Sequence, residues 1–313
     1  MPGILCLTMN PALDLFTTVD RVQPTHKLRC GAPLVHPGGG GINVARVLAR
    51  LDCDVLALHP CGGVTGEELQ SLLAAENVPT RVIPIAGETR ESFSVHEDST
   101  GLDWRFVLPG PQLAPGEWQA CLDAAAETPV RSGFVVASGS LPPGAPEDFY
   151  ARLAHRLTAH GVRLALDSSG PPLAHAVHAG VSLVKPSLRE LAEFTGTTLD
   201  TREQQLAACR RLVHSGKAET VALSLGAQGA MIVTAQHAWR AAALPVTVAS
   251  TIGAGDSFLA GVVLGLARGA SLDAALAQGI AASAAALLAS GTALCAPEDL
   301  RRLLPQVWVE ALH

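Results

Sequence analysis

Short apolar runs alternate along the chain with longer segments in which apolar residues recur every three or four positions. The short runs are rich in Val, Leu and Ala, which predicts buried strands at residues 54–60, 133–139, 162–170, 181–187 and 219–226. The longer segments predict amphipathic helices at residues 42–51, 66–76, 146–160 and 201–216. This alternation is typical of an α/β fold in which a mostly parallel sheet has helices on both faces.

Two regions break this rhythm. Residues 14–35 and 88–108 contain alternating apolar and polar positions ("LFTTVDRV", "ESFSVHE", "DWRFVLPG") with no helical segment between them. We expect these regions to form a small antiparallel sheet that projects from the core. Because the chain shows no internal repeat and no long linker, we expect residues 1–313 to form one domain.

The stretch at residues 273–290 is apolar enough to be compared with a membrane span. It consists mainly of Ala, contains Asp273 and Gln278, and follows another apolar helical segment at residues 258–267. We therefore predict two small-residue helices packed closely on the sheet. The first residues, "MPGILCLTMN", lack the cationic segment of a secretory signal and predict a first strand, so we expect a cytoplasmic protein.

Composition narrows the classes of function. Apolar residues make up 48% of the chain and charged residues 16%, as expected for a globular protein with a large core. The net charge of −6 and the scattered cations disfavour nucleic-acid and membrane partners. The seven cysteines include no CxxC pair, which predicts reduced thiols, and no histidine has a metal-ligand spacing.

The segment "STIGAGDSF" at residues 250–258 is the strongest candidate for chemistry. Gly253, Ala254 and Gly255 allow the backbone to turn tightly and to expose amides at the start of a helix, which favours a bound phosphate. Asp256 follows directly, where it could accept a proton from a hydroxyl that attacks that phosphate. The alternative is that Asp256 is a helix N-cap.

The segment "HPGGGGINVARVLARL" raises a second question. A glycine run before a helix suggests a dinucleotide site, but this run does not follow a plain strand–helix start, and no acidic residue follows at the expected position. Four glycines also allow a sugar to approach the backbone closely. Asn43 would then donate to sugar hydroxyls, or it would cap the helix.

Together with "NPALD", "ETR", "SGSLPPG", "DSSG", "KPSLRE" and "SLGAQGA", these segments resemble the PfkB or ribokinase family of sugar kinases over essentially the whole chain. The resemblance implies a ribokinase-like three-layer α/β sandwich with a β-sheet lid, a homodimer formed through that lid, and ATP with Mg²⁺. "KLRCGAPLVHPGGGGINVAR", "ENVP", "SGKAETVALSLGAQGA" and "GTALC" most resemble the ribokinase-type 6-phosphofructokinases, the minor isozyme class. That class implies phosphorylation of fructose 6-phosphate at its C1 hydroxyl.

The resemblance also implies roles for individual residues. Asp256 would be the base, and the amides of Gly253, Ala254 and Gly255 would hold the transferred phosphoryl group. The sugar phosphate would be bound by Asp14, Lys27, Gly39, Gly40, Asn43, Arg90 and Gly139. The nucleotide would be bound by Lys185, Ser187, Ser224, Gly226, Gly229 and Thr251. Asp167 is a supporting candidate from its own position: at the end of a predicted strand, it would help to organise the phosphate region or would cap the next turn. Glu190 would orient Mg²⁺ through water, and K⁺ would be bound by Ser250, Ile252 and Gly291.

Three positions depart from the family pattern. The usual Asn-x-x-Glu reads Ser187 to Glu190 here, and Ala289 and Ala293 replace side chains that are often polar, which affects the metal and nucleotide contacts expected. Kinases of tagatose 6-phosphate or fructose 1-phosphate are the alternatives within the family, but they usually carry a lysine at the position of Gly40. A non-catalytic sugar-phosphate sensor and a dinucleotide-dependent oxidoreductase are the alternatives outside this activity.

Overall fold

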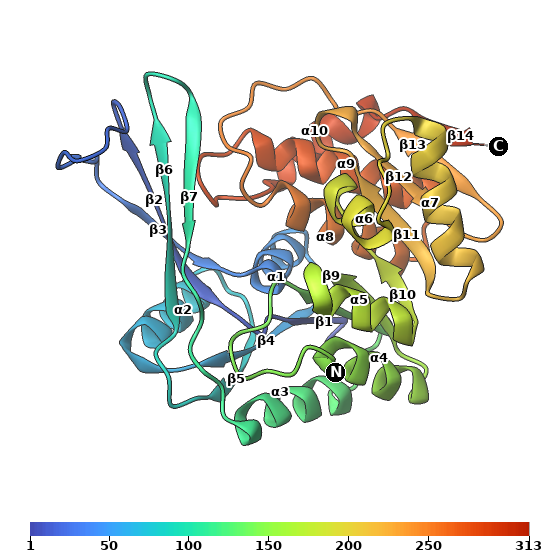
Figure 1. Ribbon diagram of the computed structural model, residues 1–313, viewed down its shortest axis with the longest axis horizontal. Helices are drawn as coiled ribbons and strands as arrows, with labels where there is room; N and C mark the ends of the chain where they lie inside the picture. Colours follow the sequence, from blue (N-terminus) through green and yellow to red (C-terminus); the bar gives the residue numbers. More distant parts are fainter. Residues whose placement is uncertain (313) are drawn as a thin grey trace.

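A ten-stranded sheet runs through the computed structural model, which describes residues 1–312 (Figure 1). Its strands in spatial order are β14 (Val309–Leu312), β13 (Ala238–Ala241), β12 (Ala230–Val233), β11 (Ala218–Ser224), β10 (Val181–Val184), β9 (Arg163–Asp167), β8 (Phe134–Ser138), β1 (Ile4–Leu7), β4 (Val55–Cys61) and β5 (Thr80–Pro84). Neighbours from β11 to β5 are parallel, whereas β12, β13 and β14 add antiparallel strands at one edge. The predicted mostly parallel α/β sheet is therefore confirmed.

Helices cover both faces of this sheet. One layer contains α3 (Pro115–Glu127), α4 (Phe149–Ala159), α5 (Gly170–Ala179), α6 (Leu188–Thr195) and α7 (Arg202–His214). The other contains α1 (Gly40–Arg50), α2 (Gly63–Ala75), α8 (Ala254–Ala267), α9 (Leu272–Leu287) and α10 (Pro297–Leu303). Strand β1 shows why two layers are needed: Leu5 and Leu7 belong to one core, and Ile4 and Cys6 to the other. Single 3₁₀ turns lie at Gly226–Gln228 and Leu304–Gln306.

The two small-residue helices pack as predicted. A Cβ added to Gly261 on α8 would lie 2.7 Å from the carbonyl oxygen of Gln278 on α9, so only glycine allows this approach. None of the described helices combines the length and the hydropathy that crossing a bilayer requires.

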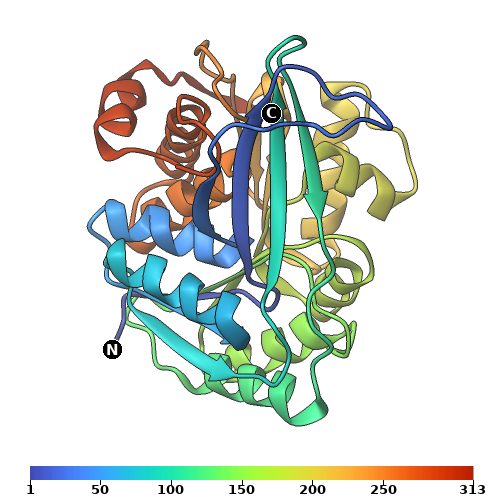
Figure 2. The ribbon, with the colours of Figure 1, turned by 90° about the vertical axis from the view of Figure 1, so that its left-hand side faces the viewer.

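The small sheet stands beside the large one and is seen face-on in Figure 2. Its strands in spatial order are β3 (Leu34–Gly38), β2 (Ala12–Val19), β6 (Arg90–Glu97) and β7 (Leu102–Val107). The expectation of an antiparallel sheet is wrong for one pair, because β2 and β6 run parallel. The chain passes through β3, α1, β4, α2 and β5 between these two strands, and this long crossover allows β6 to run in the same direction as β2.

The two faces of the small sheet differ in polarity. Cross-strand register places Asp14, Ser92 and Arg105 on one face of the sheet. Phe16 lies on the same face and is buried, so this face is turned towards the rest of the protein. Side chains of the other face include Phe93, Trp104 and Phe106, each about 40% exposed. The polar face therefore contributes to any site between the two sheets.

Candidate active site

Helix α8 begins with a backbone turn that leaves its first amides unpaired within the helix. Gly253 precedes the helix with φ of 75°, a left-handed conformation that favours glycine, and a Cβ there would overlap the side chain of Leu294. The first helical hydrogen bond runs from Ser257 N to Gly253 O at 2.9 Å. The amides of Ala254, Gly255 and Asp256 therefore remain available at the positive end of the helix dipole, where an anion is favoured.

Asp256 lies in the first turn of this helix, and its carboxylate is held from α1. Asn43 donates from Nδ2 to Asp256 Oδ2 at 2.9 Å, while Asp256 Oδ1 lies 3.5 Å from the Ser138 hydroxyl. Burial raises the pKa of Asp256, and the Asn43 hydrogen bond and the charges of Lys185 and Arg105 oppose that rise. One carboxylate oxygen is thus fixed and the other is weakly bound, as a proton acceptor requires. No side-chain cap bond is formed at the start of α8 in the described chain, so the N-cap alternative for Asp256 has no support.

An ion pair lies next to Asp256 at the ends of β9 and β10. Lys185 Nζ is 3.2 Å from Asp167 Oδ1, and both side chains are largely buried. Burial raises the pKa of Asp167 to about 6 in spite of Lys185. Burial alone would lower the pKa of Lys185, but Asp167, Asp256 and Glu190 together raise it. A Cβ added to Gly255 would lie 3.7 Å from Lys185 Nζ, so the ammonium group lies close to the free amides of α8.

The glycine run at the start of α1 is required by close contacts with the protein itself. A Cβ on Gly38 would overlap the Asp14 carboxylate, and a Cβ on Gly40 would overlap the Ser138 hydroxyl. Gly39 adopts φ of 107°, which side chains rarely allow. Because these residues pack against Asp14 and Ser138 and follow the small-sheet strand β3, they do not form the strand–turn–helix of a dinucleotide site.

Asp14 faces this run from β2 and is surrounded by cations. Burial raises its pKa to about 6, although Arg105, Arg90 and Arg46 all favour the ionised form. Arg105 on β7 acts on both Asp14 and Asp256. Sequence reasoning missed Arg105, although the alternation of "DWRFV" places it on the polar face of the strand.

Arg90 lies beside an open cavity of about 690 Å³. It donates to the carbonyls of Leu108 at 2.8 Å and Asn10 at 3.0 Å. The cavity is also lined by Asn10 and Ser140, which hydrogen-bond to each other at 3.2 Å. The buried Nε of Arg90 and Oδ1 of Asn10 have no partner within the described chain. Such unpaired polar atoms next to a cavity are suited to a polar ligand.

A second cavity of about 630 Å³ opens directly onto the start of α8. Four of the residues predicted to bind the nucleotide line it: Ser224, Gly226, Gly229 and Thr251. Ala254 and Gly255 of α8 also line it, and its apolar walls include Val246, Val248, Ile280 and Leu287. An apolar chamber that ends at free helix amides suits a planar base with attached phosphates.

Ser187 and Glu190 form a capping box at the start of α6. Glu190 N donates to Ser187 Oγ at 3.2 Å, and Ser187 N donates to Glu190 Oε2 at 2.8 Å. Ser187 also pairs with Ser224 in an isolated parallel bridge, which brings α6 to the nucleotide cavity. The residues predicted for Mg²⁺ orientation therefore also stabilise a helix end.

The residues predicted for K⁺ lie on two neighbouring segments. Ala249 N donates to Leu287 O at 2.8 Å, which joins the segment before α8 to the end of α9. Ser250 is buried and accepts from Ile252 N at 3.2 Å. Gly291 is left-handed, and a Cβ on it would lie 2.9 Å from the ring of Phe16.

Of the other residues predicted to bind the sugar phosphate, Gly139 lies close to Asp256 and its neighbours, whereas Lys27 does not. Gly139, with φ of 110°, donates from its amide to the carbonyl of Asp167 and lies next to Gly40. Lys27 is exposed on the loop between β2 and β3, which extends from the far end of the small sheet (Figures 1 and 2). It is not among the cations that act on Asp14 or Asp256 in the described chain. A role for Lys27 therefore requires a movement of the loop or a second chain.

This arrangement fits a phosphotransferase with an alcohol acceptor: a carboxylate beside free helix amides, which border an apolar cavity suited to a nucleotide. The chain belongs to the PfkB family, since the model described as pfkB family carbohydrate kinase matches residues 7–299.

Individual relatives and solved structures agree with this family assignment. The chain is 50% identical over 301 residues to the ATP-dependent 6-phosphofructokinase isozyme 2 of Mycobacterium tuberculosis, covering 96% of this chain and 88% of the relative. It is 30% identical to the 1-phosphofructokinase of Bacillus subtilis, over 99% of this chain and 100% of the relative. Structures of phosphofructokinase-2 from Escherichia coli with fructose-6-phosphate and with potassium have TM-scores of 0.91 and 0.92 at 39% and 40% identity, each covering 98% of this chain and 99% of theirs. The predicted ribokinase-like fold is confirmed.

Proposed function

We propose that this protein uses ATP to phosphorylate fructose 6-phosphate at its C1 hydroxyl, giving fructose 1,6-bisphosphate. The observation that carries the proposal is the place of Asp256: it is held by Asn43 in the first turn of α8, directly after Ala254 and Gly255, which line the apolar cavity. The greater similarity to the isozyme 2 relative than to the 1-phosphofructokinase supports fructose 6-phosphate over fructose 1-phosphate.

In the proposed reaction, Asp256 accepts the proton of the C1 hydroxyl through the oxygen that Asn43 leaves free. The C1 oxygen forms a bond to the γ-phosphorus of ATP, the bond between that phosphorus and the β–γ bridging oxygen breaks, and ADP leaves. The amides of Gly253, Ala254 and Gly255 stabilise charge on the transferred group, and Lys185 contributes a nearby cation. Asp14 accepts hydrogen bonds from sugar hydroxyls, and the backbones of Gly39, Gly40 and Gly139 border the sugar.

Two carboxylates fit Mg²⁺ that arrives with the nucleotide. Asp167 and Glu190 both act on the charge of Lys185, and Mg²⁺ is commonly bound through one or two carboxylates together with water and phosphate oxygens. When bound, Mg²⁺ neutralises charge that develops on the phosphates. Glu190 would orient its waters. We also propose K⁺ near Ser250, Ile252 and Gly291, supported by the potassium complex of the E. coli neighbour.

The residue at position 40 supports the choice of sugar phosphate. Ser138 occupies the space that a side chain at Gly40 would need, so recognition of the sugar's own phosphate falls to Arg90 with Asn10 and Ser140. A forked guanidinium is well suited to phosphate.

A coupled assay with a panel of sugar phosphates tests the proposal. We expect kcat/KM for fructose 6-phosphate to exceed that for tagatose 6-phosphate and fructose 1-phosphate by at least about tenfold, or roughly 1.4 kcal/mol. In parallel, Arg90→Ala should raise the KM for fructose 6-phosphate by about 10- to 100-fold, as expected for a lost charge-assisted hydrogen bond, and leave the KM for ATP unchanged. A preference for fructose 1-phosphate would contradict the assignment.

We further propose that the protein forms a homodimer through the small sheet. The outer face of this sheet carries a stacked aromatic pair, Phe93 and Phe106, with ring centroids 4.7 Å apart, and Trp104 beside it. Clustered exposed aromatic residues are typical of surfaces covered by a partner.

A further inference from the structure

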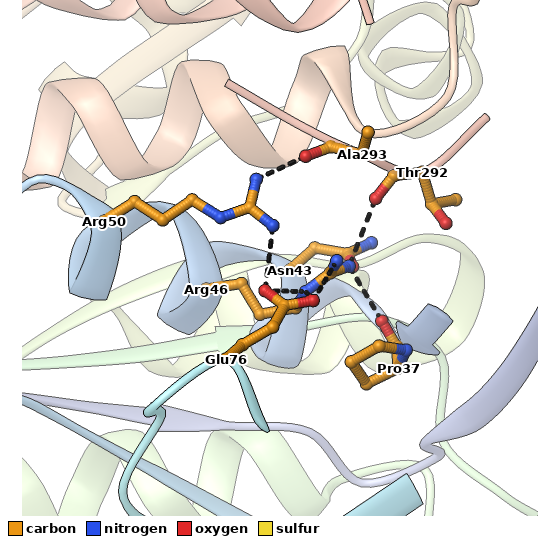
Figure 3. Close-up of polar contacts among 7 residues, drawn as sticks. All are labelled: Pro37, Asn43, Arg46, Arg50, Glu76, Thr292 and Ala293. Carbon is orange, nitrogen blue, oxygen red and sulfur yellow. Dashed lines mark hydrogen bonds and ion pairs between the residues drawn. The ribbon is translucent and has the colours of Figure 1, made fainter. Parts of the chain in front are cut away.

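Three segments distant in the sequence meet at one buried arginine, Arg46 of α1 (Figure 3). They are the start of α1 with its glycine run, the end of α2 and the loop after α9, and they carry the motifs "GGGGINVAR", "ENVP" and "GTALC". Apart from Gly291 at the proposed K⁺ site, the last two motifs have no role in the reaction as described above.

A single guanidinium group, that of Arg46, forms hydrogen bonds with residues of all three segments. Its Nη1 donates to the carbonyls of Pro37 at 2.9 Å and Thr292 at 3.2 Å, and it lies 3.4 Å from Asn43 Oδ1. Its Nε and Nη2 bind the carboxylate of Glu76 at 2.6 to 3.1 Å. The Arg46 side chain has 0% exposure, so without Glu76 a bare charge would be buried at high cost.

Glu76 stays ionised in this cluster. Burial would raise its pKa, but its bonds to Arg46 and Arg50 lower the pKa overall. Arg50 binds the same carboxylate at 2.8 Å and also donates to the carbonyl of Ala293. Figure 3 shows both guanidinium groups on the Glu76 carboxylate, with Arg46 alone reaching Asn43 and Pro37.

The contact with Asn43 determines which way its carboxamide faces. A guanidinium group only donates hydrogen bonds, so the oxygen of the Asn43 carboxamide faces Arg46 and its NH₂ faces Asp256. Asp256 Oδ2 is thereby occupied, and Oδ1 is left for a proton from the substrate. Arg46 also holds the carbonyl of Pro37, next to the glycine run against which Asp14 packs.

We propose that Arg46 is a positioning residue for phosphoryl transfer, acting through Asn43 to aim the carboxylate of Asp256 at the acceptor hydroxyl. The inference rests on the proposed function, because it requires Asp256 to be the base. Glu76 neutralises Arg46, and Thr292 anchors the loop after α9 to the same group.

Arg46→Lys tests this role, since a single ammonium group can pair with Glu76 but has no second nitrogen to reach Pro37, Asn43 and Thr292 at the same time. We expect kcat to fall about 10- to 100-fold, with KM for both substrates changing less than about threefold. Asn43→Ala should lower kcat similarly, and the double variant should be no worse than Asn43→Ala alone. Additive losses in the double variant would contradict the proposal.

The pH profile of kcat separates positioning from general support of the fold. Asp256 is acted on by Asn43, Lys185, Arg105, Asp14 and the neighbouring carboxyl group of Asp167, and Asn43 is the neighbour that Arg46 orients. Loss of the Asn43 hydrogen bond should move the acid limb of the profile to higher pH in both Arg46→Lys and Asn43→Ala. A lower kcat with an unmoved acid limb would overturn the inference.

Two further variants control for folding. Arg50→Lys changes the other arginine on Glu76 without touching Asn43, and should keep kcat within about threefold with an unmoved acid limb. The double variant Arg46→Met with Glu76→Met removes both buried charges, which such sites tolerate better than the loss of one. This double variant should show the same loss of kcat as Arg46→Lys and the same shift of the acid limb to higher pH. If Asp256→Asn abolishes turnover but these variants do not affect it, the positioning role fails and the proposed function stands.

Discussion

The carboxyl groups of Asp14 and Asp256 are buried, and the nearby cations only partly offset the effect of this burial on their pKa values. Burial raises the pKa of both, and for Asp14 the value reaches about 6. A carboxyl group with such a pKa is ionised above about pH 6 and protonated below it. The affinity for a sugar whose hydroxyls donate to Asp14 should therefore depend on pH close to neutrality.

We expect the KM for fructose 6-phosphate to rise as the pH falls through about 6, because protonated Asp14 loses its capacity to accept. The phosphate of the substrate also titrates near pH 6, so the comparison must be made with Asp14→Asn, in which the substrate still titrates but position 14 does not. The variant should show a KM at pH 8 raised about tenfold or more and a weaker dependence on pH. Steady-state kinetics from pH 5.5 to 8.5 measures both. An equal pH dependence in the two proteins would exclude Asp14 as the group responsible.

At the scale of single elements, the start of α6 combines a structural and a proposed catalytic task. The Ser187–Glu190 capping box satisfies backbone amides of an eight-residue helix, while Glu190 also acts on the charge of Lys185. The family's Asn at this position would cap equally well. Stability and Mg²⁺ dependence should therefore respond separately to substitutions at position 187.

Ser187→Ala should lower the free energy of unfolding by about 1 kcal/mol, the usual cost of a lost N-cap, whereas Ser187→Asn should leave it nearly unchanged. Both variants should alter the Mg²⁺ concentration that gives half-maximal rate, because both change the group beside Glu190. Thr201→Ala is the matched control, since Thr201 forms the same capping box with Gln204 at the start of α7. It should lose similar stability in urea unfolding with an unchanged Mg²⁺ titration. If Ser187→Ala behaves like the control, position 187 has no part in metal orientation.

The elements themselves were largely predictable because their signals are local. Apolar runs and helical periodicity placed the parallel strands and the helices between them, and the start of α8 was evident from its glycine turn. Contacts between distant segments were not predictable in this way. No local sequence pattern predicts that Arg46 binds Glu76 and Thr292. The same holds for the effect of the Arg105 charge on Asp256. The parallel pairing of β2 with β6 likewise depends on the crossover between them.

At the scale of the whole molecule, the small sheet has two faces with different tasks. Its polar face brings Asp14 and Arg105 to the candidate site, and its outer face exposes aromatic side chains. A partner that covers the outer face would also stiffen the sheet that holds the sugar. Assembly and sugar binding should therefore be linked.

Light scattering should give twice the 32.3 kDa mass of one chain, because clustered exposed aromatic side chains favour burial against a second copy. Phe106→Asp places a charge in that face and should shift the protein to monomers, with a raised KM for fructose 6-phosphate. Trp308→Asp is the control, since Trp308 is 82% exposed beside β14 in the large sheet. It should leave the mass unchanged. A monomeric wild-type protein, or a dimer that tolerates Phe106→Asp, would contradict this interface.

The central claim is that Asp256 accepts the proton of the acceptor hydroxyl at the free amides of α8. The most direct measurement is the kcat of Asp256→Asn, together with the dissociation constants of ATP and fructose 6-phosphate from calorimetry. Asn keeps the shape of the side chain but cannot accept the proton. We predict a kcat lower by about two to four orders of magnitude, the usual contribution of a positioned base, with both dissociation constants changed less than about fivefold. A variant that retains near-normal turnover would show that Asp256 is not the base.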